Sequence, residues 1–202
     1  MLAFASMKPK SLVVYYAPTF AQARDIAWRM LKAYAPSYGR ISNVNESRLE
    51  VKINDSEVWL RGVENYESAR GLGIHFLVID EIAMMRNWYN IWEEVLRATT
   101  ADTQGTGLFC STPKGYNHWH NLWEKGQAEE DGYKSWTFKS EENPFLPREE
   151  IAQAKKELRP EAFEQEWEAQ FRSTFGLAHS QFERRIHILD SFDIPGEWSY
   201  GR

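Results

Sequence analysis

The chain has 202 residues, of which 43% are hydrophobic, 26% charged and 14% aromatic, and its formal net charge is −5. This composition excludes a chain that is disordered throughout, and no apolar run reaches the roughly 18–20 residues that a membrane-spanning helix needs. The acidic balance argues against a free-standing, sequence-nonspecific DNA binder, and the single cysteine, Cys110, predicts an intracellular chain without a disulfide framework.

The first third of the chain predicts a strand, a helix and a hairpin. Leu12–Tyr16 is a short β-rich run. Thr19 and Gln22 have the spacing of a capping box, which predicts a helix from there to about Tyr34. The expected buried face of that helix consists of Ala23, Ile26, Ala27, Met30 and Leu31. Alternating apolar residues around the turn Asn54–Ser56 predict a β-hairpin within 41–62.

The remainder alternates between short apolar runs and helical patterns. Strands are expected at Ile74–Ile79, Gly107–Cys110 and Tyr133–Phe138. Helices are expected at Trp88–Arg97, Asn117–Glu124, Pro147–Leu158 and Pro160–Phe171. This order predicts an α/β fold, a mostly parallel sheet with flanking helices. The tryptophans Trp119, Trp123, Trp136 and Trp167 are expected to pack between elements.

The strongest functional pattern is the apolar run that ends in Asp80-Glu81. In open α/β sheets, ligands bind at the carboxyl ends of the strands. There Asp80 fits a carboxylate that holds a hydrated Mg²⁺ on nucleotide phosphates, and Glu81 fits a residue that orients and deprotonates water. Taken alone, the pattern also fits a strand that ends in a polar turn.

Two further patterns gain weight from their position. Ser111-Thr112-Pro113-Lys114-Gly115 follows the next apolar strand, so Ser111 and Thr112 are expected beside Asp80, although an ordinary turn explains the same residues. Arg70 lies on a glycine-containing loop before the acidic strand, where it suits a phosphate or a solvated loop equally. Pro18 and Thr19 follow the first strand, and the cap alone accounts for Thr19.

In this order, these segments resemble the large terminase subunit of tailed phages. The resemblance rests on Ala17-Pro18-Thr19 after a strand, the hairpin, Arg70-Gly71, Leu77–Glu81, Ser111–Gly115 and the charged helical segment Arg159–Trp167, and it spans about residues 10–200. The resemblance lies in the order of the whole set.

The resemblance implies an ATPase core of the P-loop NTPase class, related to RecA and helicases, that moves double-stranded viral DNA into a procapsid. Asp80 resembles the Walker B carboxylate for Mg²⁺, and Glu81 the catalytic glutamate that acts on ATP. Ser111 and Thr112 resemble the motif that couples hydrolysis to movement, Pro18 and Thr19 a nucleotide contact, and Arg70 the arginine that acts across subunits of a ring. The implied partners are the viral DNA concatemer, the portal protein, the small terminase subunit and further copies of the chain, without a membrane. The implied location is the host cytoplasm, transiently at the portal.

The sequence departs from the family pattern at both ends. No Gly-x-x-x-x-Gly-Lys-[Ser/Thr] motif occurs in the 202 residues, so the core is expected to miss its first strand and phosphate loop and to be inactive alone. The expected divisions are a partial ATPase core at 1–140, a helical lid and linker at 141–175, and the truncated start of a nuclease domain at 176–202. The alternatives are a non-catalytic scaffold protein with a decayed ATPase fold and a fragment of a helicase-like ATPase.

Overall fold

The computed structural model describes residues 1–172, which form one compact unit. The centre of this unit is a single six-stranded sheet with the order β2-β3-β4-β1-β5-β6. The strands are β1 (Leu12–Ala17), β2 (Ile41–Asn45), β3 (Glu50–Ile53), β4 (Ser56–Gly62), β5 (Phe76–Ile79) and β6 (Thr106–Phe109). The expected division at residue 140 stays a prediction, and the segment 176–202 lies outside the described residues.

The sheet is parallel in the half that carries the acidic pair and antiparallel in the other half. β4, β1, β5 and β6 are parallel neighbours, whereas β2, β3 and β4 form an antiparallel meander that contains the predicted hairpin. In the parallel half, Tyr16 is level with Ile79 and Ile79 with Phe109. The carboxyl ends of β1, β5 and β6 therefore lie along one rim of the sheet, and the α/β prediction is confirmed.

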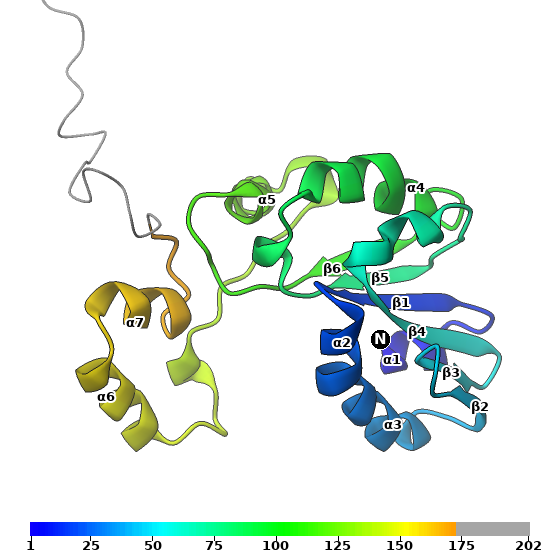
Figure 1. Cartoon of the computed structure of the whole chain (residues 1–202), viewed down its shortest axis with the longest axis horizontal. Coiled ribbons are helices and arrows are strands. Elements are labelled where there is room, and N and C mark those ends of the chain that lie inside the picture. Colours follow the sequence, from blue (N-terminus) through cyan, green and yellow to red (C-terminus); the bar gives the residue numbers. More distant parts are fainter. Residues whose placement is uncertain (173–202) are drawn as a thin grey trace, which may run out of the picture. The chain divides into compact units, whose positions relative to one another are not determined.

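Helices cover both faces of the sheet, because both faces are apolar. Val13, Tyr15, Val58 and Leu60 belong to one hydrophobic cluster with the helical segment Phe20–Tyr34. Alternate residues of the same strands form the second cluster with the π-helix Asn90–Leu96. Figure 1 shows α2 (Phe20–Gln22) and α3 (Arg29–Tyr34) on one side of the sheet, and α4 (Arg97–Thr99) and α5 (His118–Gln127) on the other. A short helix, α1 (Leu2–Met7), precedes β1.

The helix that follows β1 begins as predicted but buries a different face. The Thr19 hydroxyl accepts a hydrogen bond from the Gln22 amide, 3.2 Å away, and caps the helix. Residues Ala23–Trp28 are π-helical, and a π turn brings residues five positions apart onto one side. Ala23 and Trp28 are therefore buried together, whereas Ile26 and Met30 are 60% and 54% exposed. The expected face assumed 3.6 residues per turn and was wrong for these two residues.

The segment Tyr133–Phe138 is not a strand of the sheet, so this prediction was also wrong. Its side chains do alternate: Ser135 Oγ donates to the Trp123 carbonyl (2.7 Å) and Trp123 Nε1 donates to Thr137 Oγ1 (3.1 Å). The even-numbered Trp136 and Phe138 are 64% and 76% exposed, so the expected packing of Trp136 is not found. Alternation by itself does not make a strand, because a strand also needs a neighbour with which its backbone can pair.

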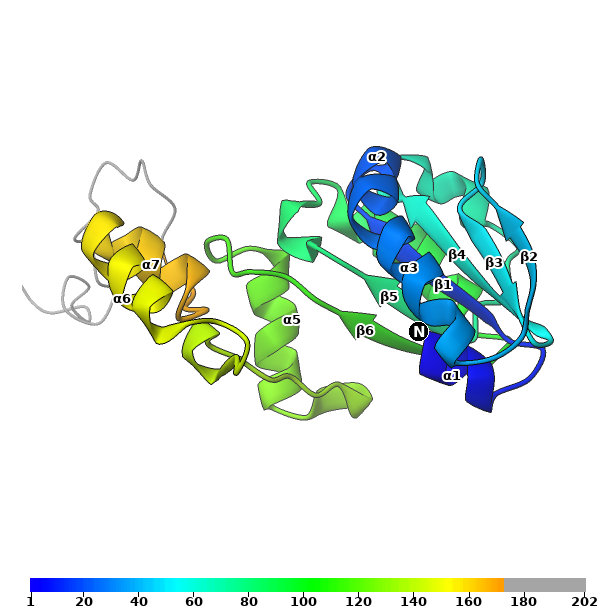
Figure 2. The same ribbon diagram turned by 90° about the horizontal axis from the view of Figure 1, so that it is seen from below.

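Two helices close the described part of the chain. They are α6 (Arg148–Glu157), which follows Pro147 as its N-cap, and α7 (Pro160–Glu166), with Pro160 at its first position. Helix α7 ends before the predicted Phe171, since Ala169 adopts a left-handed conformation that no helix continues through. Figure 2 shows the two helices side by side. Within residues 1–172, no helix is both long and apolar enough to span a bilayer.

Candidate functional site at the carboxyl rim of the sheet

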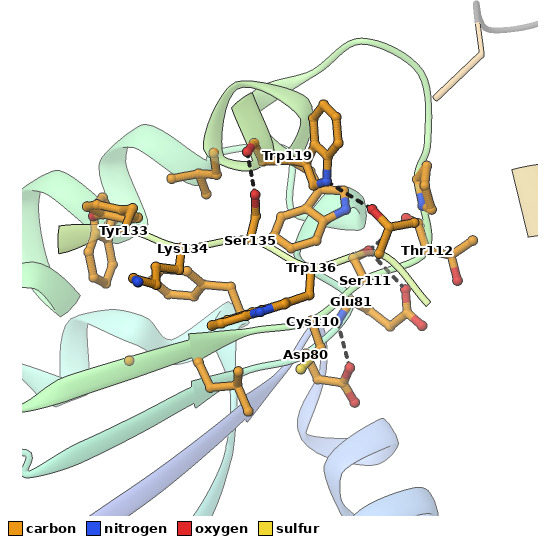
Figure 3. A pocket seen from close by; sticks show the side chains of 18 of the residues that line it. Asp80, Glu81, Cys110, Ser111, Thr112, Trp119, Tyr133, Lys134, Ser135 and Trp136 are labelled. Carbon is orange, nitrogen blue, oxygen red and sulfur yellow. Dashed lines mark hydrogen bonds between the residues drawn. The ribbon is translucent and has the colours of Figure 1, made fainter. Parts of the chain in front are cut away.

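The acidic pair and the hydroxyl-bearing turn lie next to each other, as the sequence predicts. Asp80 and Glu81 follow β5, and Cys110 and Ser111 follow β6. The Cys110 amide continues the ladder with a hydrogen bond to the Ile79 carbonyl (2.9 Å). Figure 3 shows Asp80, Glu81, Ser111 and Thr112 gathered at the end of the sheet. Parallel pairing causes this proximity, because parallel strands end at the same edge.

Both oxygens of the Asp80 carboxylate have a hydrogen-bond donor. The Tyr15 hydroxyl on β1 donates to Oδ2 at 2.6 Å, and the backbone amide of Glu81 donates to Oδ1 at 3.0 Å. The Tyr15 side chain is 7% exposed, and burial together with the hydrogen bond to Asp80 raises its pKa well above 10, so the phenol stays protonated and remains a donor. Tyr15 therefore fixes the orientation of Asp80 through a short, charge-assisted bond.

Glu81 is held in a conformation and an environment that cost free energy. Its φ and ψ are 51° and 41°, in the left-handed region, where a side chain meets steric strain. Burial, and secondarily the charge of Asp80, raise the pKa of its carboxyl above the ordinary value, against a lowering by the Ser111 hydrogen bond. A carboxyl group with a raised pKa in a cleft, on a residue with a strained backbone, is typical of a functional site.

Ser111 joins the turn after β6 to the turn after β5. Its Oγ accepts a hydrogen bond from the Ala83 amide (3.2 Å) and lies 3.3 Å from Glu81 Oε2. The first residues of α5 bind the same turn, since the Asn117 side-chain amide donates to the Ala83 carbonyl (3.1 Å) and His118 Nε2 lies 2.7 Å from the Ile82 carbonyl. The acidic pair is thus connected by hydrogen bonds to the start of α5.

The rim opens into a cavity of about 900 Å³. Its wall includes Asp80, Glu81, Ser111 and Thr112, the strand β6 and the segment Tyr133–Phe138. Carboxylate and hydroxyl oxygens are suitable metal ligands for Mg²⁺, which keeps several waters and takes further ligands from phosphates. The donor set therefore fits such an ion, although residues 1–172 contain no cluster of three acidic, histidine or cysteine side chains that would hold a metal by itself.

The other predicted site residues do not line this cavity. Pro18 and Thr19 follow β1 and so lie on the same rim, but the Thr19 hydroxyl is engaged in capping α2. Arg70 borders a separate cavity of about 290 Å³, where it pairs with Glu67 and donates to the Glu94 carbonyl (3.1 Å). The roles predicted for these three residues stay predictions.

Two residues of the site escaped the sequence reasoning. Tyr15 looks like an ordinary strand residue, and only its place beside β5 brings its hydroxyl to Asp80. Cys110 lines the same cavity as the acidic pair, and burial, and then the charges of Asp80 and Glu81, raise the pKa of its thiol. A polar atom on the strand adjacent to an acidic strand end was the available signal for Tyr15.

A helix-flanked sheet whose parallel half ends in an acidic pair and a hydroxyl-bearing turn is the architecture of a P-loop NTPase core. The large terminase ATPase domain of Thermus phage P74-26 has the same fold, with a TM-score of 0.68 and 20% identity over 84% of this chain and 80% of that chain. The large terminase of another thermophilic bacteriophage, in complex with ADP, gives a TM-score of 0.64 and 15% identity over 93% of this chain and 47% of that one.

The chain belongs to the family of the terminase large subunit, T4likevirus-type, N-terminal, whose model matches residues 1–186. It is 26% identical over 191 residues to the large terminase subunit of Escherichia phage T5. This match covers 91% of this chain and 42% of that protein. The large terminase subunit of Thermus phage G20c is also 26% identical, over 98 residues, which are 48% of this chain and 19% of that protein. The chain therefore spans less than half the length of these curated relatives.

Proposed function

We propose that the chain supplies the ATP-hydrolysing centre of a DNA-packaging motor, which couples hydrolysis to the movement of double-stranded viral DNA into a procapsid. One observation carries the proposal. In a terminase ATPase fold, the ends of β5 and β6 bring Asp80, Glu81, Ser111 and Thr112 to one rim of a cavity. The partners proposed with this role are the DNA concatemer, the portal protein, the small terminase subunit and further copies of the chain, in the host cytoplasm.

The chemical roles follow from the contacts. Asp80, oriented by Tyr15, would hold a hydrated Mg²⁺ ion, and such an ion would supply positive charge against the phosphates of ATP. Glu81 accepts the proton of the water that attacks the γ-phosphorus, and its raised pKa makes it a better base than an ordinary carboxylate. The bond between the γ-phosphorus and the bridging oxygen breaks as the water oxygen bonds to phosphorus, and ADP and inorganic phosphate are released.

The coupling of ATP hydrolysis to DNA movement is assigned to the hydrogen bonds between the turn after β5 and the turn after β6. Ser111 lies 3.3 Å from Glu81 Oε2 and accepts from the Ala83 amide, and Asn117 binds the Ala83 carbonyl. A shift of the turn upon loss of the γ-phosphate therefore displaces the start of α5. Residues 141–175, which include α6 and α7, are proposed as the lid and linker.

Arg70 is proposed to act on the nucleotide of a neighbouring subunit. It borders a cavity other than that of Asp80 and Glu81, and its guanidinium is held by Glu67 at the surface. An arginine in that position is accessible to another copy of the chain, and a guanidinium supplied across an interface stabilises the transition-state charge in many NTPases. Arg70→Ala is expected to leave nucleotide affinity unchanged and to lower turnover only when subunits assemble.

The first experiment measures binding of Mg·ATP to the 202-residue chain by equilibrium dialysis. We expect weak binding or none, because the 202 residues contain no Gly-x-x-x-x-Gly-Lys-[Ser/Thr] motif to hold the β- and γ-phosphates.

The second experiment joins a strand and a phosphate loop of that pattern to the chain and measures steady-state ATP hydrolysis. Glu81→Gln in the joined chain should retain ATP binding and lose turnover by at least about 100-fold.

The matched control is Glu93→Gln, which changes an acid that lies outside the cavity of the acidic pair. Steady-state hydrolysis by the Glu81→Gln chain at the parent rate would remove Glu81 from the mechanism. A joined chain that binds Mg·ATP and never turns it over, with Glu81 intact, would support the alternative of a non-catalytic scaffold protein.

A further inference from the structure

The backbone of Glu81 has a conformation that a residue of its type does not favour. Its φ and ψ of 51° and 41° lie in the left-handed region, and the short 3-10 helix Ile82–Met84 begins directly after it. A residue other than glycine stays in that region only where the surrounding structure holds it there. The contacts of the residues that follow Glu81 therefore decide where its carboxyl lies.

Two other segments hold the backbone of the short helix by hydrogen bonds. From the turn after β6, a backbone carbonyl accepts from the Ile82 amide (3.3 Å) and Ser111 Oγ accepts from the Ala83 amide (3.2 Å). From the start of α5, the Asn117 side-chain amide donates to the Ala83 carbonyl (3.1 Å), and His118 Nε2 lies 2.7 Å from the Ile82 carbonyl. The contact of His118 is the shortest of the four, and it acts on the residue directly after the acidic pair.

The chemistry of this contact assigns its direction. A carbonyl oxygen can only accept, so His118 Nε2 carries a proton and donates it. The Ile82 carbonyl also accepts from the Met85 amide (3.0 Å), which is the local bond that closes the short helix. The imidazole thus takes the second lone pair of that oxygen and ties the short helix to α5.

A stack of aromatic rings fixes the plane of the imidazole. His118 stacks on Trp88, with 5.7 Å between the ring centres and 13° between the ring planes. Trp88 in turn stacks on Trp92 at 5.6 Å and 7°, and Phe109 of β6 packs edge-on against both tryptophans, at 5.8 Å and 5.1 Å. Trp88 is 2% exposed and belongs to the second hydrophobic cluster. The direction of the His118 N–H is therefore set by the core.

We propose that His118 is a positioning residue that keeps Glu81 in its left-handed conformation, with the carboxyl beside Ser111. It acts through the Ile82 carbonyl and touches no reacting atom. Loss of its N–H frees the short helix to turn, and Glu81 then relaxes to a right-handed conformation that carries the carboxyl away from Ser111. The conformational claim stands without ATP, whereas its consequence for hydrolysis rests on the proposed function of Glu81.

Three substitutions separate the donor from the ring. His118→Phe keeps an aromatic ring against Trp88 and removes the N–H. His118→Gln gives up the ring and keeps a donor, since the amide nitrogen of glutamine is as many bonds from Cα as Nε2 of histidine. His120→Phe is the matched control, because His120 lies on the same helix and has its contacts with Glu124 and Phe171.

The first measurement is NMR of the 202-residue chain without nucleotide. A positive φ brings the amide proton of a residue close to its own Hα and gives an intense cross-peak between them. We expect that intensity at Glu81 in the parent, His118→Gln and His120→Phe chains. In His118→Phe it should fall by about threefold, toward that of a right-handed residue, because the intensity depends steeply on distance. A nitrogen spectrum of the parent should also show a proton on His118 Nε2.

The second measurement uses the backbone preference of the residue at position 81. Glycine is favoured over alanine in the left-handed region, and alanine is favoured over glycine in the right-handed region. In the parent, Glu81→Gly should therefore have a higher urea midpoint than Glu81→Ala. In the His118→Phe background this order should reverse. A general loss of stability would lower both midpoints and would not reverse their order.

Three results would overturn the positioning role and leave the proposed function standing. They are an unchanged cross-peak at Glu81 in His118→Phe, the same loss of that cross-peak in His118→Gln, and a parent spectrum without a proton on Nε2. The parent spectrum requires no variant, so the role is testable even where a substitution prevents folding.

The effect on hydrolysis is measured in the chain joined to a phosphate loop. His118→Phe should lower kcat by at least about tenfold with KM unchanged, and His118→Gln should restore it. If Glu81 loses its left-handed conformation in His118→Phe while kcat stays at the parent value, the positioning role is supported and Glu81 is refuted as the base.

Discussion

Replacement of Tyr15 by phenylalanine removes one hydroxyl and no other contact of the site. That hydroxyl donates to Asp80 Oδ2 at 2.6 Å from a side chain that is 7% exposed. A hydrogen bond to a charged group contributes about 1.5–3 kcal/mol. Asp80 is half-buried and can recruit water in the variant, which places the expected loss of unfolding free energy near the lower end, at about 1–2 kcal/mol.

Urea denaturation followed by tryptophan fluorescence measures this loss. The midpoint should fall while the slope of free energy against urea stays constant, because the surface exposed on unfolding is unchanged. Tyr34→Phe is the control, because Tyr34 is 57% exposed and its change should stay within about 0.5 kcal/mol. Equal midpoints for Tyr15→Phe and the parent would refute the claim that this hydroxyl holds Asp80.

Three further predictions follow from the same structure. Glu81→Gln should raise the free energy of unfolding at pH 7. Because the pKa of Glu81 is raised in the folded chain, the parent loses stability as pH rises through that pKa, whereas the uncharged amide of the variant does not. A lower urea midpoint for the variant at pH 7 would contradict this. Leu77→Ala should cost about 2–5 kcal/mol in the same denaturation assay, because Leu77 is 0% exposed in the second hydrophobic cluster. Burial raises the pKa of Tyr16 to about 12, so its contribution is fully present below pH 10 and is lost between pH 10 and about 12, which a pH titration of the parent against Tyr16→Phe should detect.

Local signals predicted most elements, because short-range chemistry decides where an element begins. The hydroxyl of Thr19 caps a helix wherever that sequence is helical, and a turn at Asn54 reverses a chain that alternates on both sides. The buried face of the same helix was not predictable, since a π turn within Ala23–Trp28 shifts the packing by one residue. That shift reflects the fit of the helix on the sheet, which neighbouring residues along the chain do not encode.

The candidate site divides in the same way. The pair Asp80-Glu81 and the turn Ser111–Gly115 were identifiable because strand ends in parallel sheets collect polar residues. Two other features depend on which strands are neighbours and on the path of the chain between them. They are the distance of Arg70 from the acidic pair and the hydrogen bond from Tyr15 to Asp80.

The sequence by itself determined the class of fold, the order of its elements and the acidic strand end, because hydrophobic periodicity and turn chemistry act over a few residues. Only the tertiary structure decided the strand order, and with it why Tyr133–Phe138 is extended without being a strand. Pairing between strands joins residues far apart in the chain, and a strand exists only where such a partner is present.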